Sequence, residues 1–203
     1  MLVAHAGGGL PDRTYTNSIE ALDLAYAHGL RIFEIDFLTL PFGSIAVGHD
    51  LSDLLRRGRA SVPAILDWMR AHPDARLVTD FKTDNVEGLR HLSRMASDLA
   101  GRIIPQIYRP SEYRPIMDLG FAPPIFTLYR NDDPRWLEFA NSTDLFAVTM
   151  PASWAGKAKA VRQAVFLHTI DEPADLDGVV GLYTNCLVPA EPEQRAGARL
   201  QSG

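Results

Sequence analysis

Short apolar segments rich in β-branched residues alternate along the chain with segments whose apolar residues recur at helical spacing. This alternation predicts strands and helices in the order βαβα, which is typical of a parallel sheet covered by helices. The expected strands are Leu2–His5, Arg31–Phe37, Leu77–Lys82, Ile103–Tyr108, Ile125–Tyr129, Leu145–Thr149, Val165–Thr169 and Val180–Thr184. The expected helices are Ser18–Ala27, Pro63–Ala71, Asn85–Leu99, Pro110–Leu119, Pro134–Asn141 and Trp154–Gln163.

Eight strands with intervening helices indicate an α/β fold, a compact (β/α)8 TIM barrel in which residues 1–203 form a single domain. A further helix can begin at Pro189, before a frayed tail. Residues 41–50 predict a small turn-plus-strand excursion after the second strand. A doubly wound open sheet is the alternative, but Gly7-Gly8-Gly9 has neither the GxGxxG spacing nor the following Lys and Ser or Thr of a phosphate-binding loop.

Composition and charge narrow the class of partner to small molecules. With 203 residues, 46% of them apolar, the chain is long enough to bury one complete core. The formal net charge of -5 is spread without long runs, which argues against a nucleic-acid surface. No segment approaches about 18 consecutive apolar residues, which argues against a membrane-spanning helix. A single cysteine, Cys186, and the absence of a leader-like segment after Met1 predict a cytoplasmic protein, while the oligomeric state stays open.

Polar residues gather where the predicted strands end, and in a barrel the carboxyl ends of the strands carry the chemistry. His5 ends the first predicted strand, and His49 follows a short apolar segment in the excursion. Glu34 and Asp36 lie two positions apart on the second strand, so their side chains point to the same side. Asp80 occupies the end of the third strand. The other polar residues at predicted strand ends are Lys82, Gln106, Tyr108, Tyr129, Thr149, His168 and Thr184.

Five short motifs follow one another within roughly the first 85 residues. They are His5-Ala6-Gly7, Thr16-Asn17, Glu34-Ile35-Asp36, His49-Asp50 and Asp80-Phe81-Lys82. Their order and spacing resemble those of the glycerophosphodiester phosphodiesterases of the phospholipase-C-like barrel superfamily. That family has His-Arg-Gly, Glu-Asn, Glu-x-Asp, His-Asp and Glu-x-Lys at the corresponding places. Phe166–Ile170 and Gly181–Asn185 look like the last two strands of the family, which extends the resemblance to the whole chain.

The resemblance implies a metal-dependent hydrolase that acts on a glycerophosphodiester or a similar alkyl phosphodiester. Its metal ligands would be Glu34, Asp36 and Asp80, and ligation by oxygen atoms alone suits Mg²⁺ or Ca²⁺. Clustered carboxylates also need a cation, because they raise one another's pKa. His5 and His49 would share the acid and base work, and the sequence does not say which residue takes which role.

Three further residues are candidates for contact with the substrate. Lys82 would bind the phosphate, or alternatively would form an ion pair with Asp80 or Glu34. Asn17 would orient the phosphate or cap the helix that begins at Ser18. His168 falls where relatives commonly place an aromatic residue and is a candidate substrate contact.

Two departures from the family pattern bear on the activity. Ala6 stands in the place of the family's Arg and Thr16 in the place of its Glu, which removes a bidentate phosphate donor and the carboxylate that faces it. Arg13 and Arg109 are candidate substitutes for the lost Arg. The departures raise two alternatives: a barrel that binds a phosphorylated ligand without turnover, and a lyase-like relative that only forms a cyclic phosphate. Asp80 is also one methylene shorter than the family's Glu.

Overall fold

Eight parallel strands close into a barrel in the structure, a computed structural model that describes residues 1–128, 135–171 and 176–185. The strands are β1 (Leu2–Ala4), β2 (Ile32–Thr39), β4 (Arg76–Phe81), β5 (Ile103–Ile107), β6 (Ile125–Thr127), β7 (Ala147–Pro151), β8 (Val165–His168) and β9 (Gly181–Thr184). They are hydrogen-bonded in the order β1-β9-β8-β7-β6-β5-β4-β2, and β1 also pairs with β2. Because this last pairing closes the ring, the predicted (β/α)8 TIM barrel is confirmed and the open doubly wound sheet is excluded.

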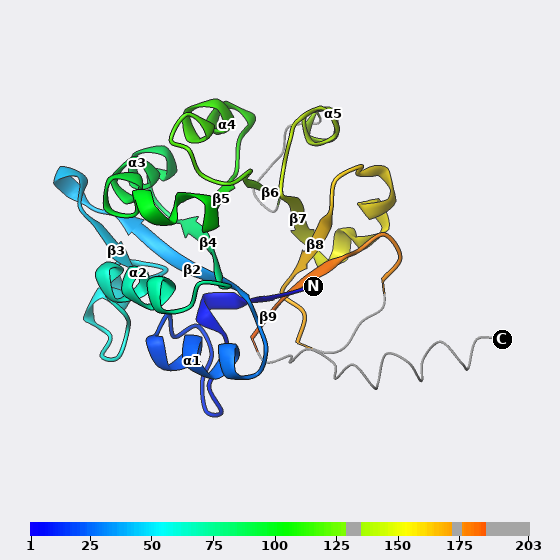
Figure 1. Cartoon of the computed structure of the whole chain (residues 1–203). Helices are drawn as coiled ribbons and strands as arrows, with labels where there is room; N and C mark the ends of the chain where they lie inside the picture. The colour runs from blue at the N-terminus through cyan, green and yellow to red at the C-terminus, as the bar shows by residue number, and fades with distance from the viewer. Residues whose placement is uncertain (129–134, 172–175, 186–203) are drawn as a thin grey trace.

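The α-helices lie outside the ring of strands (Figure 1). They are α1 (Ile19–Ala27), α2 (Val62–Ala71), α3 (Asn85–Met95), α4 (Pro110–Met117) and α5 (Trp136–Ser142). A serine precedes each of the first two helices, since its hydroxyl can accept a backbone N–H that the first turn leaves unpaired. Ser18 accepts from the N–H of Ala21, and Ser61 accepts from that of Ala64. The predicted boundaries of these two helices agree with the structure to within a residue.

The connection between β7 and β8 differs from the prediction. The predicted helix Trp154–Gln163 is wrong, because the structure has 3-10 turns over Ala152–Ala160. Only Ala158 in this segment is buried. Trp154 and Ala155 are only partly buried against the core, so a longer regular helix would have little buried apolar surface to stabilise it.

Other predicted elements are shorter in the structure or lie outside the described residues. Helix α3 ends at Met95, and the chain continues as 3-10 turns over Ser97–Arg102, so the predicted helix Asn85–Leu99 is too long. The helix proposed from Pro189 lies outside the described residues, as do Tyr129, Cys186 and the start of the predicted fifth helix.

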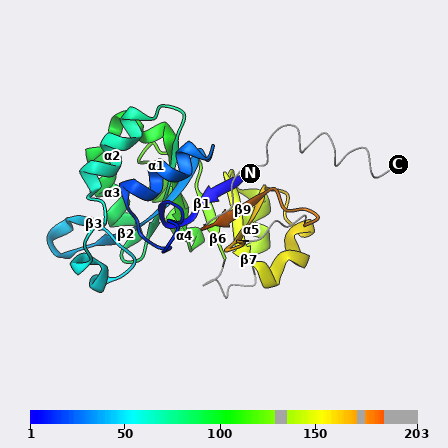
Figure 2. The same cartoon turned by 90° about the horizontal axis from the view of Figure 1, so that it is seen from below.

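The predicted excursion after the second strand is a hairpin. β3 (Ile45–Val47) pairs antiparallel with the end of β2, after 3-10 turns over Pro41–Gly43. Figure 2 shows the hairpin at one side of the barrel. The N–H of Gly48 donates to the carbonyl of Asp36 at 2.9 Å, so the hairpin brings His49 beside the end of β2.

The barrel interior has an apolar layer with a polar layer above it. Each strand gives one residue to the apolar cluster: Val3, Ile32, Val78, Ile104, Ile125, Ala147, Phe166 and Tyr183. Successive side chains of a strand alternate in direction, so the residue two positions further along points the same way. In every case that residue is polar: His5, Glu34, Asp80, Gln106, Thr127, Thr149, His168 and Asn185. The carboxyl end of the barrel therefore carries a ring of hydrogen-bonding and titratable groups.

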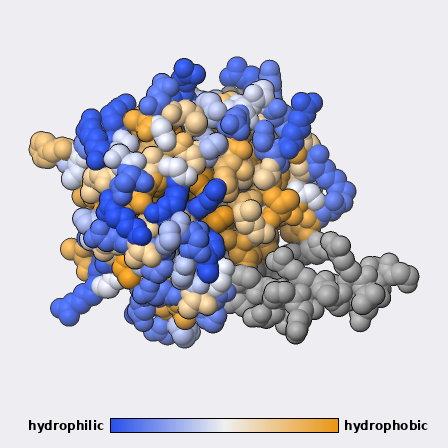
Figure 3. All heavy atoms as spheres, in the orientation of Figure 1, coloured by the Kyte–Doolittle hydropathy of each residue, from blue (hydrophilic) through white to orange (hydrophobic). Residues whose placement is uncertain are grey.

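A second apolar layer packs between the strands and the helices. It includes Phe33, Ile35 and Phe37, which alternate with the inward-facing residues of β2. On the face drawn in Figure 3, hydrophilic surface lies around most of the rim and apolar surface gathers near the middle. Within the described ranges, no helix combines the length and the apolar character that a crossing of a bilayer requires.

Candidate functional site

Three buried carboxylates meet at the carboxyl end of two neighbouring strands. Glu34 and Asp36 come from β2 and Asp80 comes from β4, in a register that pairs Asp36 with Asp80. One ligand oxygen from each residue lies within 4.8 Å of the others. The three residues are 1%, 0% and 4% exposed. Because burial of uncompensated carboxylates costs several kcal/mol for each group, the cluster requires positive charge close to it.

Lys82 provides part of that charge. Its Nζ lies 2.8 Å from Oδ1 of Asp36 and 2.7 Å from Oδ2 of Asp80. Lys82 thus forms the ion pair with Asp80 that was one of its two predicted roles, and it pairs with Asp36 as well. The hydroxyl of Tyr108 donates to the other oxygen of Asp80. With all four charged groups ionised, three negative charges against one positive charge leave a formal charge of -2.

The surroundings of Glu34 favour a cationic partner. Its Oε1 is buried with no hydrogen-bond partner among the described residues, and its Oε2 accepts the N–H of Ala6 at 2.7 Å. Burial, followed by the charges of Asp36 and Asp80, raises the pKa of Glu34 well above its usual range. Burial also acts to raise the pKa of Asp36, but Lys82 and a hydrogen bond from Asn17 bring that pKa below its usual value. A set of oxygen donors with one unpartnered oxygen and a charge of -2 fits a divalent cation such as Mg²⁺ or Ca²⁺.

Two residues in left-handed backbone conformations hold the cluster in place. Ala6 has a φ of 49° and Asn17 a φ of 47°, and the N–H of Asn17 donates to the carbonyl of Ala6 at 3.0 Å. The amide of Asn17 donates to Oδ2 of Asp36 at 2.9 Å, and its oxygen accepts the N–H of Asp36 at 3.0 Å. Non-glycine residues with positive φ cost on the order of 1 kcal/mol or more each, and such strain concentrates at functional sites. Since Ser18 caps α1, the capping interpretation of Asn17 is wrong.

His5 begins a 3-10 turn directly after β1 and lies beside the carboxylates. Its Nδ1 is 3.1 Å from Oδ1 of Asn185, and its Nε2 is 3.9 Å from Oε2 of Glu34. The ring of Tyr15 meets it edge to face at 4.6 Å between centroids. Burial lowers the pKa of His5, and the hydrogen bond with Asn185 partly opposes that effect. His5 is therefore a neutral, firmly held imidazole near neutral pH.

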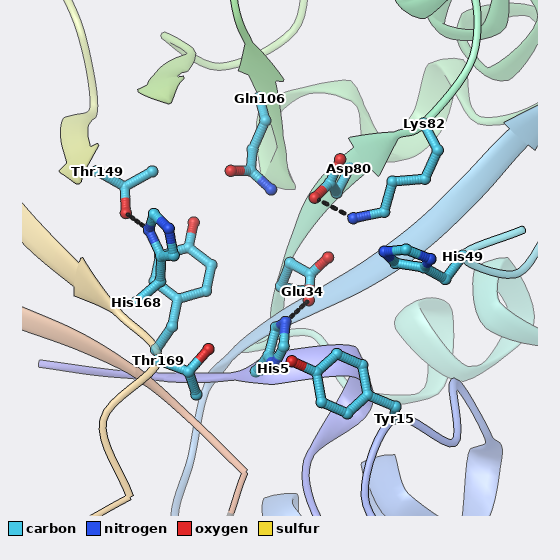
Figure 4. A pocket seen from close by; sticks show the side chains of 11 residues that line it. His5, Tyr15, Glu34, His49, Asp80, Lys82, Gln106, Thr149, His168 and Thr169 are labelled. Carbon is cyan, nitrogen blue, oxygen red and sulfur yellow. Dashed lines mark hydrogen bonds and ion pairs between the residues drawn. The ribbon is translucent and has the colours of Figure 1, made fainter. Parts of the chain in front are cut away.

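His49 lies at the open side of the same site. Its side chain is 48% exposed, with Nδ1 4.0 Å from a carboxylate oxygen of Asp50. Its backbone N–H donates to Oδ2 of Asp53 at 2.8 Å, which fixes the main chain beneath the half-exposed ring. Figure 4 shows the rings of His5 and His49 and the carboxylate of Glu34 directed into one cavity. One histidine is thus partly buried and positioned, while the other is largely in contact with solvent.

A cavity of about 300 Å³ joins these groups to a wall of mostly uncharged polar side chains. Its lining residues are His5, Tyr15, Glu34, His49, Asp80, Lys82, Gln106, Thr149, His168, Thr169 and Tyr183. Arg13 and Arg109 are not among these lining residues. Arg13 pairs with Glu20 at the surface and Arg109 precedes α4, so neither takes the place of the lost Arg at this cavity.

His168, on the polar wall, is held in its neutral form. Its Nδ1 is 3.1 Å from the hydroxyl of Thr149. Burial, and then the charges of His5 and Lys82, lowers the pKa of His168 to about 4. In the unfolded chain a histidine titrates near pH 6.5, so between these two pH values the unfolded state binds more protons. His168 therefore makes its full contribution to the free energy of unfolding above pH 6.5, and the protein loses this contribution as the pH falls toward 4.

We expect the His168→Gln variant to lose less stability than the wild type when the pH falls from 7 to 4.5. The difference is on the order of 1–2 kcal/mol after allowance for partial solvent exposure. Urea unfolding at a series of pH values measures it, with the exposed His28 replaced by Gln as the matched control. Parallel stability profiles of the wild type and His168→Gln would show that His168 does not titrate in this way.

Two residues that touch His5 were not identified from the sequence. Tyr15 lies in the loop between β1 and α1 with a φ of 56°, a conformation that no pattern in the sequence signals. Asn185 lies one residue beyond the end of the predicted last strand. The alternation of inward-facing residues after Tyr183 is the signal that points to Asn185, because position 185 continues the same side of the strand.

Comparison with known proteins identifies the fold. No family model matches the chain, and no curated protein matches it by sequence. A glycerophosphodiester phosphodiesterase from Parabacteroides distasonis ATCC 8503 matches with a TM-score of 0.72 and 17% identity, over 98% of both chains. A glycerophosphodiester phosphodiesterase from Agrobacterium tumefaciens str. C58 matches with a TM-score of 0.65 and 15% identity, over 91% of this chain and 96% of its own.

A third solved structure is that of an Oleispira antarctica phosphodiesterase in complex with the product sn-glycerol-3-phosphate. It matches with a TM-score of 0.67 and 12% identity, over 99% of this chain and 97% of its own. The chain thus has the barrel fold of glycerophosphodiester phosphodiesterases along nearly its whole length, which is the fold that the five sequence motifs imply.

Proposed function

We propose that this chain is a metal-dependent phosphoric diester hydrolase that acts on a glycerophosphodiester or a similar alkyl phosphodiester. The observation that carries the proposal is the buried set of Glu34, Asp36 and Asp80, which shares one end of the barrel with His5 and His49. The fold supports it, because the matching solved structures include a glycerophosphodiester phosphodiesterase and a phosphodiesterase in complex with the product sn-glycerol-3-phosphate.

Glu34, Asp36 and Asp80 would hold the cation. When bound, Mg²⁺ or Ca²⁺ would neutralise phosphate oxygens as negative charge develops on them. Lys82 would keep the metal-free cluster from repelling itself and would lie close to the phosphate. Asn17 would hold Asp36 in position through its two hydrogen bonds to that residue.

His5 and His49 would carry out the proton transfers. One ring takes the proton of the attacking hydroxyl as the new P–O bond forms, and the other gives a proton to the alkoxide as the old P–O bond breaks. A pair of this kind contributes roughly 10²–10⁴-fold for each group at neutral pH. The attacking group is a neighbouring hydroxyl of the glycerol or a water molecule, and in the first case water then opens the cyclic phosphate.

The uncharged wall of the cavity would bind the alcohol part of the substrate. Gln106, Thr149 and Thr169 offer donors and acceptors without charge, and His168 adds a neutral imidazole. Groups of this kind pair with hydroxyls and leave the charged end of the cavity to the phosphate. His168 is in this view a substrate contact.

Phosphorus NMR of the purified chain with glycerophosphoglycerol and Mg²⁺ or Ca²⁺ tests the proposal. We expect the phosphodiester signal to be replaced by that of a phosphomonoester. Accumulation of a cyclic phosphodiester signal would identify the lyase alternative. An unchanged spectrum after long incubation with either cation, at a protein concentration that binds the compound, would identify a barrel without turnover.

One observation favours that second candidate, a barrel that binds a phosphorylated ligand. The ammonium group of Lys82 already lies between Asp36 and Asp80, and Ala6 replaces the Arg that would hold a phosphate. The two candidates differ in their response to cations. A hydrolase requires that Mg²⁺ or Ca²⁺ bind and raise the thermal unfolding temperature, whereas a barrel that relies on Lys82 alone does not.

The proposal also covers the domain organisation, the cellular compartment and the partners of the chain. Residues 1–203 would act as one domain in the cytoplasm on a small-molecule phosphodiester, without a nucleic-acid partner.

A further inference from the structure

We propose that Asp171 and Asn185 form a positioning relay that fixes the ring and the tautomer of His5, with Nε2 presented to the cavity as a proton acceptor. The relay itself consists of hydrogen bonds in the folded protein. Its catalytic consequence rests on the proposed function, in which His5 transfers a proton.

Asp171 is the residue of the relay that lies furthest from His5. Its Oδ1 accepts the hydroxyl of Thr184 at 3.1 Å and the backbone N–H of Asn185 at 2.7 Å. Its Oδ2 accepts the side-chain amide of Asn185 at 2.8 Å. Three donors aimed at one carboxyl group favour its ionised form, and they hold the pKa of Asp171 below its usual value although burial acts to raise it. Asp171 is therefore an acceptor on both oxygens.

An acceptor at Asp171 fixes the orientation of the Asn185 amide. The NH₂ group of Asn185 must face the carboxylate, since the reverse orientation would place two oxygens against each other. The carbonyl oxygen of Asn185 then faces His5, 3.1 Å from Nδ1. Asn185 is only 8% exposed. Gly9 packs so closely on its main chain that a Cβ at position 9 would lie 2.1 Å from the carbonyl oxygen of Asn185.

A carbonyl oxygen can only accept, so Nδ1 of His5 must carry the hydrogen. In the neutral imidazole Nε2 is then without a hydrogen, and its lone pair lies in the plane of the ring on the side of Glu34, 3.9 Å from Oε2. The edge-to-face contact with Tyr15 restrains the ring further. The relay thus prepares His5 to accept a proton, which leaves the donation of a proton to the leaving group to the exposed His49.

The tautomer of His5 can be read directly by long-range ¹H–¹⁵N NMR of histidine-labelled protein at a pH where His5 is neutral. We expect the pattern of an Nδ1–H imidazole in the wild type, assigned by its loss in His5→Gln. In Asn185→Ala we expect a mixture of tautomers or the Nε2–H form. The exposed His28 provides an internal control, because its signals are expected to stay unchanged.

Kinetics supply the second measurement. With glycerophosphoglycerol as substrate, we expect Asn185→Ala to lower kcat by roughly 10- to 100-fold with little change in KM, as for other residues that orient a functional histidine. The exchanged pair Asp171→Asn with Asn185→Asp rebuilds the relay. In this pair the amide introduced at position 171 would donate to the carboxylate introduced at position 185, which still accepts from Nδ1 of His5. We expect the exchanged pair to restore the tautomer and most of kcat.

These experiments test the relay separately from the proposed enzymatic function. An Nε2–H imidazole in the wild type would overturn the relay without any need for a variant to fold. Retention of both the tautomer and kcat in Asn185→Ala would also overturn it. If the tautomer changes as expected but no phosphodiester is turned over by the wild type, the relay stands and the proposed function fails.

Discussion

Removal of divalent cations with a chelator is expected to lower the rate of phosphodiester hydrolysis by at least about 10³-fold. Addition of Mg²⁺ or Ca²⁺ is expected to restore the rate. The reason is electrostatic. When all three are ionised, Glu34, Asp36 and Asp80 outweigh the single charge of Lys82 by two, so without a cation the end of the cavity that receives the anionic phosphate is itself negative. Activity assays in excess chelator, followed by titration with each cation, measure the effect.

The Glu34→Gln variant sharpens this prediction, because two of its properties should change in opposite directions. The substitution keeps the size of the side chain and the acceptor for the N–H of Ala6. It removes a carboxylate that burial and two neighbouring carboxylates disfavour, so the metal-free protein is expected to gain on the order of 1 kcal/mol of stability. It also removes one metal ligand, so the affinity for the cation is expected to fall by about 100-fold or more.

Calorimetric titration with Mg²⁺ or Ca²⁺ and thermal unfolding with and without the cation measure the two changes. Asp118→Asn is the matched control, since Asp118 is an exposed carboxylate that pairs with Arg114 far from the cavity. Full turnover in excess chelator, or cation affinity in Glu34→Gln equal to that of the wild type, would show that these carboxylates do not serve a metal.

The strands of the barrel could be predicted because a parallel sheet buried on both sides requires continuous apolar segments, and turns separate them clearly. The polar residues of the site could be predicted for a related reason. A carboxylate inside an otherwise apolar strand, such as Glu34, has no packing role, so its presence in the pattern indicates chemistry. The regular alternation of inward-facing residues then places Asp36 and Asp80 beside it.

What the sequence does not contain is the direction of groups that loops hold. Asn17 is adjacent to the capping residue Ser18, and only the left-handed conformation at position 17 turns its amide to Asp36. Tyr15 reaches His5 through the same loop. The segment Trp154–Gln163 has helical spacing, but the spacing alone does not show that Ala158 is the one fully buried residue of Ala152–Ala160.

Replacement of His5 or His49 by Ala is expected to lower kcat by about 10²-fold or more in each case. Both rings line the cavity that Glu34 and Asp80 also line. The methyl group of an alanine in place of either ring cannot transfer a proton. His28→Ala is the matched control, because this histidine is exposed at the end of α1 and lies outside that cavity. Steady-state kinetics on the same phosphodiester, at saturating cation, measure the three variants. A variant of His5 or His49 that keeps most of the activity would remove that residue from the mechanism.

Stability should separate the two histidines even where activity does not. His49 is half exposed and its main chain is held by Asp53, so His49→Ala is expected to unfold within about 0.5 kcal/mol of the wild type. His5 makes a partly buried hydrogen bond with Asn185 and packs on Tyr15, so His5→Ala is expected to cost about 1 kcal/mol, through the unpaired oxygen of Asn185.

The double variant tests whether the contributions of the two rings to kcat are coupled. If His5 takes a proton while His49 gives one in the same transition state, removal of the first leaves the second with little to contribute. The combined loss in kcat is then expected to be much smaller than the product of the two single losses. A fully multiplicative loss would mean that the two histidines contribute independently to the rate-limiting transition state, which would contradict a coupled proton transfer. Because the stability changes at these two sites are small and measured separately, the kinetic coupling reports on the chemistry and not on unfolding.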